Sequence, residues 1–238
     1  SAKEGETAFT MIRAKAALTV TDCKSNERTG YIDPASGLWK EGAYSGDESV
    51  TAVTLKGGII MGGHGEWGGA INATAATKIY NVNLANHSTI KEGGAIYVKG
   101  DYAIYLHGAT FVANSAATEG GAIYLYGGKM SADGDNRFFY NKAVKGGAIY
   151  AVKDNMGIVA TLTMTGGSFT GNTATGDGGA ISVRSDCSAT VIDVKFDSNS
   201  ANGTASNQGG GAVYVGWGTL TVGGATIFVL DVDKFIKL

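Results

Sequence analysis

The sequence lacks the features that mark several large protein classes. Its 238 residues include one proline and two cysteines, so it is neither a collagen nor a scaffold held by a disulfide framework. Only 17% of the residues are charged and the formal net charge is −2, which leaves no basic surface for nucleic acid. No apolar run reaches the roughly 18–20 residues of a membrane-spanning helix. We therefore expect no nucleic-acid partner and no direct membrane insertion.

Glycine, by contrast, is abundant. Many of the 38 glycines belong to a recurring Gly-Gly-Ala-Ile/Val motif, whose copies begin at Gly68, Gly93, Gly120, Gly146, Gly178 and Gly210. A second motif, phenylalanine followed three positions later by asparagine, precedes most copies: Phe111/Asn114, Phe138/Asn141, Phe169/Asn172 and Phe196/Asn199. Such a regular recurrence indicates a protein built from stacked repeats.

Within each repeat, apolar residues alternate along the chain, as at Ile123 and Leu125 or at Leu162 and Met164. A period of two is typical of β-strands, and no segment of helical period is long enough to bridge parallel strands. We therefore predict an all-β, single-domain parallel β-helix with three short strands per coil and about 4.8 Å between coils. Because parallel crossovers are overwhelmingly right-handed, the coil should be right-handed.

This fold assigns places to the repeated side chains. The four phenylalanines should stack inside the tube, and the four asparagines should form a hydrogen-bonded ladder at a bend. The glycine pairs should lie at tight corners, where a positive φ or a close backbone contact excludes a side chain.

The two motifs together resemble the repeats of chlamydial polymorphic outer membrane proteins, and they are similar to repeats in large adhesin-like surface proteins of gut bacteria and archaea. The resemblance extends over roughly Gly57–Val215. In that family the repeats build the surface-exposed passenger of an autotransporter. The resemblance therefore implies a bacterial, secreted cell-surface protein that acts in cell adhesion, as an adhesin or stalk, and not as an enzyme.

The two ends of the chain depart from the repeat. Residues 1–50 should form an irregular N-terminal coil or cap, with Ala17–Thr21 as a strand and a long excursion near Asp33–Gly46; a helix over Glu6–Ala17 is the alternative. Residues 51–225 should form the repeat β-helix, and residues 226–238 a C-terminal strand or cap of the same domain. Because this last segment is apolar and lacks a polar cap, we expect the chain to be part of a longer protein.

Tyrosines are the candidate ligand-binding residues. Tyr97, Tyr124, Tyr150 and Tyr214 occupy equivalent positions after the glycine motif, and Tyr105 and Tyr126 are candidates to extend the patch. Because the isoleucines beside them should point inward, alternation places these rings outside. Outward rings stack on sugars or contact proteins, so we expect a surface glycan or protein receptor as the partner. The alternative is that the rings only stabilise neighbouring strands, by about 0.2–1 kcal/mol per pair.

A second candidate lies just before each glycine pair, where Trp67, Glu92, Glu119, Lys145 and Asp177 occupy equivalent corners. Stacked coils should bring Glu92 and Glu119 close to the roughly 5 Å separation of a retaining glycosidase pair. A carbohydrate-active enzyme, a polysaccharide lyase or glycoside hydrolase, is therefore the alternative function. The exposed corners favour instead a solvated ladder in which Lys145 neutralises its neighbours.

Ice binding on a flat threonine face is a third possible function. The threonines that suggest it are Thr19, Thr21, Thr161, Thr163, Thr219 and Thr221. The coils between these groups interrupt the row, which argues against this function.

Metal ions and cofactors are not expected. The histidines are His64, His87 and His107; the first two should lie one coil apart, but no third ligand has a suitable spacing. Asp133, Asp135 and Asn136 resemble part of a calcium loop whose later ligands are missing, so we expect a surface turn.

The two cysteines should be free thiols. Cys23 and Cys187 are expected five or more coils apart along the axis, which is more than about 20 Å. A disulfide requires Cα atoms within about 7 Å of each other.

Overall fold

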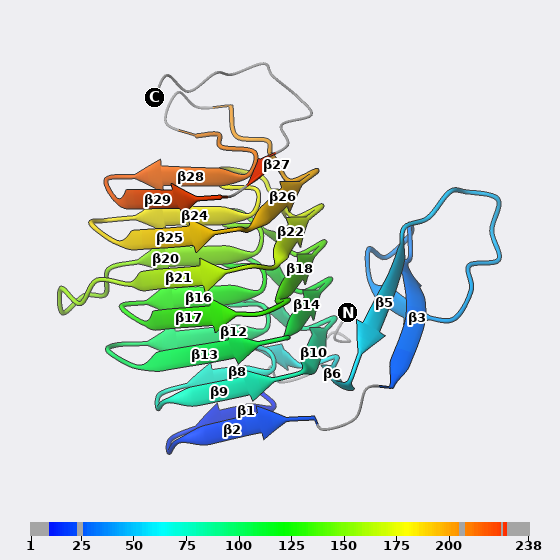
Figure 1. The fold of residues 1–238 in the computed structure, drawn as a ribbon, viewed down its shortest axis with the longest axis horizontal. Helices are drawn as coiled ribbons and strands as arrows, with labels where there is room; N and C mark the ends of the chain where they lie inside the picture. The colour runs from blue at the N-terminus through cyan, green and yellow to red at the C-terminus, as the bar shows by residue number, and fades with distance from the viewer. Residues whose placement is uncertain (1–9, 23–25, 205–207, 225, 228–238) are drawn as a thin grey trace.

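The computed structural model describes residues 10–22, 26–204, 208–224 and 226–227, and all regular secondary structure in them is β-strand. The strands stack into a solenoid in which each strand pairs in parallel with its counterpart one coil on (Figure 1). The chain follows the near face toward the right, returns along the far face and climbs as it does so, which is a right-handed coil (Figure 1). The predicted all-β parallel β-helix is confirmed.

Four parallel sheets, here called sheets 1 to 4 in the order in which a coil meets them, make up the solenoid. Sheet 1 contains β1 (Ile12–Ala14), β8 (Ile71–Ala73), β12 (Ile96–Lys99), β16 (Ile123–Tyr126), β20 (Ile149–Val152), β24 (Ile181–Arg184) and β28 (Val213–Gly216). Sheet 2 contains β2 (Leu18–Thr21), β9 (Thr77–Tyr80), β13 (Ala103–His107), β17 (Lys129–Asp133), β21 (Thr161–Thr165), β25 (Ser188–Ile192) and β29 (Thr219–Gly223).

The other two sheets have shorter strands. Sheet 3 contains β6 (Gly58–Met61), β10 (Val82–Ala85), β14 (Thr110–Val112), β18 (Arg137–Phe139), β22 (Ser168–Thr170), β26 (Lys195–Asp197) and β30 (Thr226–Ile227). Sheet 4 contains β7 (His64–Gly65), β11 (Ser88–Thr89), β15 (Ser115–Ala116), β19 (Lys142–Ala143), β23 (Thr173–Ala174) and β27 (Ser200–Ala201). Sheets 1 to 3 each receive one strand from a coil, which gives the three strands expected per coil. Sheet 4 is an addition, because a two-residue strand is too short to show alternation in the sequence.

The interior contains both predicted columns. The rings of Phe111, Phe138, Phe169 and Phe196 are fully buried and stack with centroids 4.6–5.1 Å apart and planes within 8° of parallel. Beside them, the Asn141 side chain donates to the Phe111 carbonyl and to the Asn172 side-chain oxygen. Its own oxygen accepts from the backbone and side-chain amides of Asn114. Every polar atom of this buried amide is thus paired, which a buried amide requires.

The glycine pairs mark a corner at which each residue has its own constraint. Gly120 has φ of 66°, a left-handed conformation that side chains disfavour. A Cβ on Gly121 would overlap the carbonyl oxygen of Gly147 in the next coil. The first glycine of a pair is therefore required for its backbone conformation and the second for the close contact between coils.

The first coil carries the predicted excursion. β1 and β2 pair with β8 and β9, so the described part of Glu6–Ala17 contains a strand and the helical alternative is wrong there. The chain then forms an antiparallel sheet of β3 (Glu27–Ile32), β4 (Trp39–Glu41) and β5 (Ala52–Lys56), which lies beside sheet 3 in Figure 1.

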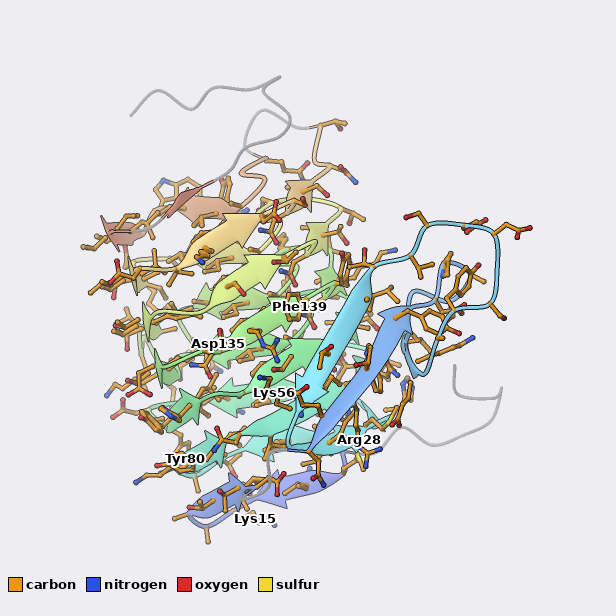
Figure 2. The ribbon with its side chains drawn as sticks, turned by 45° about the vertical axis from the view of Figure 1, so that its right-hand side comes forward. Lys15, Arg28, Lys56, Tyr80, Asp135 and Phe139 are labelled. Atoms are coloured by element: carbon orange, nitrogen blue, oxygen red, sulfur yellow. The ribbon has the colours of Figure 1, made fainter. Side chains whose placement is uncertain are left out.

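This antiparallel sheet covers apolar residues on the outer side of sheet 3. Trp39 and Leu55 are buried against Val112, and Phe139 packs against the same cluster where the two sheets meet (Figure 2). Both backbone groups of Trp39 hydrogen-bond the Asn86 side chain. Farther along sheet 3, the residue equivalent to Phe139 is Thr170, then Asp197. Toward the C-terminal coils, where the antiparallel sheet does not reach, this outward row is therefore polar.

Cys187 is a buried free thiol, as predicted, and burial raises its pKa. Cys23 and most of residues 226–238 lie outside the described residues. Of the residues described, none forms a helix long and apolar enough to cross a bilayer.

Candidate functional site

The predicted tyrosine column lies on the outer side of sheet 1. Tyr97, Tyr124 and Tyr150 occupy equivalent positions on β12, β16 and β20, while the isoleucine before each points into the core. Their rings stack with centroids 5.4 and 5.5 Å apart and planes 8° and 6° from parallel. Alternation therefore identified the correct face and the correct partners.

The expectation that these rings form an exposed stripe is wrong. Tyr97 and Tyr124 are each 8% exposed and Tyr150 is 7% exposed, in a cluster that Trp67, Tyr126 and Val152 complete. Burial, followed by the charge of Glu92 or Glu119, raises the pKa of all three hydroxyls well above that of a free tyrosine. The corner residues and the rings on adjacent coils cover the column, so it forms a second, peripheral core. Whether these tyrosines bind a ligand stays a prediction.

The other predicted ligand-binding tyrosines are dispersed. Tyr214 occupies the same row, but Ser182 separates it from Tyr150, and the Arg184 guanidinium lies 4.4 Å from its ring centroid. Tyr105 does not extend the stripe, because it lies on β13 of sheet 2, where its hydroxyl donates to Asp133 over 2.7 Å. Tyr126 does join the column, with its ring 6.0 Å from that of Tyr124.

The corner column contains the expected neutralising contact, but the expectation that its corners are exposed is wrong, because none of the five residues is exposed. Lys145 Nζ lies 3.1 Å from Glu119 Oε1, between adjacent coils. Burial and the charge of Glu119 raise the pKa of Glu92, while a hydrogen bond from the Trp67 side chain opposes this shift. Asp177, farther along, is buried and paired with Arg184. Glu119 is therefore paired with a cation, the Lys145 ammonium group.

The histidines are accounted for by local hydrogen bonds. His64 aligns with Ser88, not with His87, and its Nδ1 lies 2.7 Å from the Ser88 hydroxyl oxygen, so the expected pairing of His64 and His87 is shifted by one residue. Fully buried His87 takes the position of Asn114 in the ladder one coil earlier. Its Nδ1 accepts from the Gly63 amide at 2.9 Å, so Nε2 carries the proton and donates to the Ile60 carbonyl at 2.9 Å. Burial lowers its pKa to about 4.

The calcium-like segment forms a turn with internal contacts. Asp133 is bound by the side chains of His107 and Tyr105, and the hydrogen bonds from these two residues lower its pKa. Asn136 is buried and accepts from the Ala109 amide. Among the described residues, no group of three potential metal ligands occurs.

The hydroxyl face of sheet 2 is more continuous than expected. Ser131, Thr163, Thr190 and Thr221 align on four successive coils, and Thr161, Ser188 and Thr219 align on three. Lys78 and Tyr105 separate the first of these rows from Thr19, and Lys129 precedes the second row. The interruption that the sequence suggested is therefore confined to the N-terminal coils.

A groove at the N-terminal end of sheet 1 was missed by the sequence analysis. Two short side chains, Asn72 on β8 and Thr74 directly after it, lie between longer ones on both sides. The longer side chains are those of Arg13 on β1, Lys15 directly after β1, and Tyr97 and Lys99 on β12. With Trp67 at one corner, these residues line a cavity of about 310 Å³, here called the cationic groove. One signal was present in the sequence, the break in the aromatic row where Asn72 replaces tyrosine after the glycine motif. The pairing of Asn72 with Arg13, which completes the groove, becomes visible only once the register is known.

Comparison with protein families supports the resemblance inferred from the motifs. Three segments, residues 108–126, 137–152 and 166–184, match the Chlamydia polymorphic membrane protein repeat. Each match contains a strand of sheet 3, the glycine corner that follows it and the next strand of sheet 1. These three segments are thus similar to the polymorphic membrane protein repeat. No curated protein and no solved structure gives a significant match.

Proposed function

We propose that this chain is a non-catalytic segment of a bacterial cell-surface adhesin or stalk, which displays a β-helical flank to glycans or proteins of a host or neighbouring cell. The observation that carries the proposal is the match of three repeats to the polymorphic membrane protein family, whose name places its members at a membrane. The proposed location is the outer, cell-exposed side of that membrane.

The physical construction suits a stalk. Continuous columns of phenylalanine and asparagine link each coil to the next through stacked rings and paired amides. Bending the rod would open these contacts, which lie in a buried interior where unpaired amides are costly. A stiff rod that lengthens by about 4.8 Å per coil can hold a binding surface away from the cell.

The flank that faces a partner is proposed to be the outer side of sheet 1. It combines partly exposed aromatic side chains, such as Trp67 and Tyr126, with cations such as Lys99. Aromatic faces and charged groups are the common elements of glycan and protein recognition. The tyrosine column itself is buried, with Trp67 and Tyr126 packed against it.

The proposal is tested with the purified chain on a glycan array and on whole cells, beside an assay for reducing-sugar release. We expect binding to cells or glycans without release of sugar. Sugar release that disappears in Glu119→Gln would replace this function with the enzymatic alternative. Failure to bind cells, glycans and proteins alike would contradict the adhesin role.

A further inference from the structure

We infer that the cationic groove binds an acidic saccharide, a sugar that bears a carboxylate or sulfate group. This inference deepens the proposed function, since it names the ligand class and the place on the flank where it binds. It rests on the shape of the groove, its charge and an unpaired buried amide, none of which involves the repeat match, since all the lining residues precede the matched segments.

The shape follows from the strand order. β1, β8 and β12 are neighbours in sheet 1, so the outward residues of β8 lie midway between those of β1 and β12. The outer two strands are two spacings apart, about 9.6 Å. Because Asn72 and Thr74 are much shorter than the side chains that flank them, the sheet is hollowed along β8 with room for one flat ring. Trp67 and Tyr97, with ring centroids 6.3 Å apart, form the aromatic end of this hollow.

The charged side chains that line the groove are all cationic. Arg13, Lys15 and Lys99 are exposed, and within the described residues none of the three takes part in an ion pair. By contrast, the nearby Lys91 is bound by Glu66, and Glu92 is hydrogen-bonded by the Trp67 side chain. The neighbouring charges are therefore occupied, while the three groove cations are free to bind an anion. An arginine can bind a carboxylate or a sulfate through two parallel N–H donors, and the lysines beside it add positive charge.

The side-chain amide of Asn72, which lines the groove, also points to a ligand. Asn72 is 8% exposed, and its Oδ1 is buried without a hydrogen-bond partner. A buried acceptor without a donor costs about 1–3 kcal/mol, so a residue left in this condition calls for a functional explanation. A sugar hydroxyl is a suitable donor once the amide turns this covered oxygen toward the groove that Asn72 lines. The combination of a ring-sized hollow, aromatic walls, an amide and three cations fits an acidic sugar better than a neutral sugar or an apolar ligand.

The test measures binding of oligogalacturonate, its fully methyl-esterified form and a sulfated oligosaccharide of the same length. The ester retains the sugar and removes the charge, so we expect it to bind at least tenfold more weakly than one of the two anions. Equal affinity for the ester, or binding of neither anion, would overturn the inference.

Two variants locate the site. Lys99→Glu reverses one groove charge, and Thr74→Tyr fills the hollow with a ring while leaving all three cations in place; each should weaken binding at least tenfold. Lys78→Glu is the matched control, because Lys78 is an exposed lysine on β9, in the same coil as β8 but on sheet 2. Lys15, labelled in Figure 2, marks the N-terminal end of the solenoid at which the groove lies.

Thermal unfolding of each variant confirms that the fold persists. If Lys99→Glu and Thr74→Tyr bind the anion as the parent does, the groove is not the site. In that case, cell binding by the parent would still support the adhesin role, so the two proposals fail separately. Equal weakening by Lys78→Glu would show that general surface charge binds the anion, and would also overturn the inference.

Discussion

Two aromatic columns run along this solenoid, one inside it and one outside, and they are less different than alternation suggests. The phenylalanines of the inner column are enclosed by all the parallel sheets and are fully buried. The tyrosines of the outer column lie on a single sheet, yet each is 7–8% exposed. The same coil spacing stacks both sets of rings, at 4.6–5.1 Å inside and 5.4–5.5 Å outside. A position that points away from the core is therefore not necessarily in solvent.

The two columns should still differ in how they respond to a deleted ring. Phe138 has neighbours above, below and on every side, so Phe138→Ala should leave a closed cavity. We expect a loss of about 3–5 kcal/mol in the free energy of unfolding, measured by urea denaturation. Phe138→Leu, which retains most of the volume, is the control and should cost less than half as much. A loss below about 1 kcal/mol would mean that the inner column is not a true core.

The inner side can also be tested by pH, through His87. Its pKa is about 4 in the folded protein and 6.5 in its ordinary state, so the folded protein favours the neutral ring. The contribution of neutral His87 to the free energy of unfolding is therefore fully present above pH 6.5, and it declines as the pH falls from 6.5 toward 4. The loss at pH 4 should be about 3 kcal/mol, because each pKa unit corresponds to about 1.4 kcal/mol.

His87→Asn is the matched control for this pH effect. Asparagine occupies the equivalent position in four later coils, and its amide can accept from Gly63 and donate to Ile60 as the neutral imidazole does. Urea denaturation of both proteins at pH 7 and pH 4 makes the comparison. If the parent and the variant lose the same stability between these values, His87 is not the titrating group.

Truncating a side chain of the outer column should reduce the free energy of unfolding by less than truncating one of the inner column. Tyr124→Ala is expected to cost about 2 kcal/mol, because a side chain of this size is buried but the gap opens toward flexible corner residues and water. Because these outward tyrosines are buried, replacing one is expected to affect the stability of the fold. Thermal unfolding of Tyr124→Ala beside Phe138→Ala measures the difference directly. Equal losses would erase the distinction between the two columns.

The sequence predicted the repeated features of the fold well, but it predicted poorly which outward side chains are covered by their neighbours. Motif spacing gave the coil, the phenylalanine stack and the asparagine ladder, because each depends only on which residues recur. The burial of Tyr124 could not be predicted, since alternation gives the face of a strand but not how closely neighbouring rings such as Tyr97 and Tyr150 pack around it. The cationic groove was missed for a related reason. It depends on the register of Asn72 between Arg13 and Tyr97, and a 59-residue separation between Arg13 and Asn72 hides that neighbour relation.

The smallest expected effect concerns the corner residues that cover the outer column. Glu119 and Lys145 are only partly exposed, at 21% and 33% of their side-chain surface, but pairs near the surface contribute little. Glu119→Gln should therefore reduce the free energy of unfolding by less than about 1 kcal/mol. Because the charge of Glu119 helps to raise the pKa of Glu92, the variant should also move that pKa toward its ordinary value, which a carboxyl NMR titration would detect. A large loss of stability with no change at Glu92 would show that Glu119 holds the corner by packing, and the covering layer would then belong with the inner core.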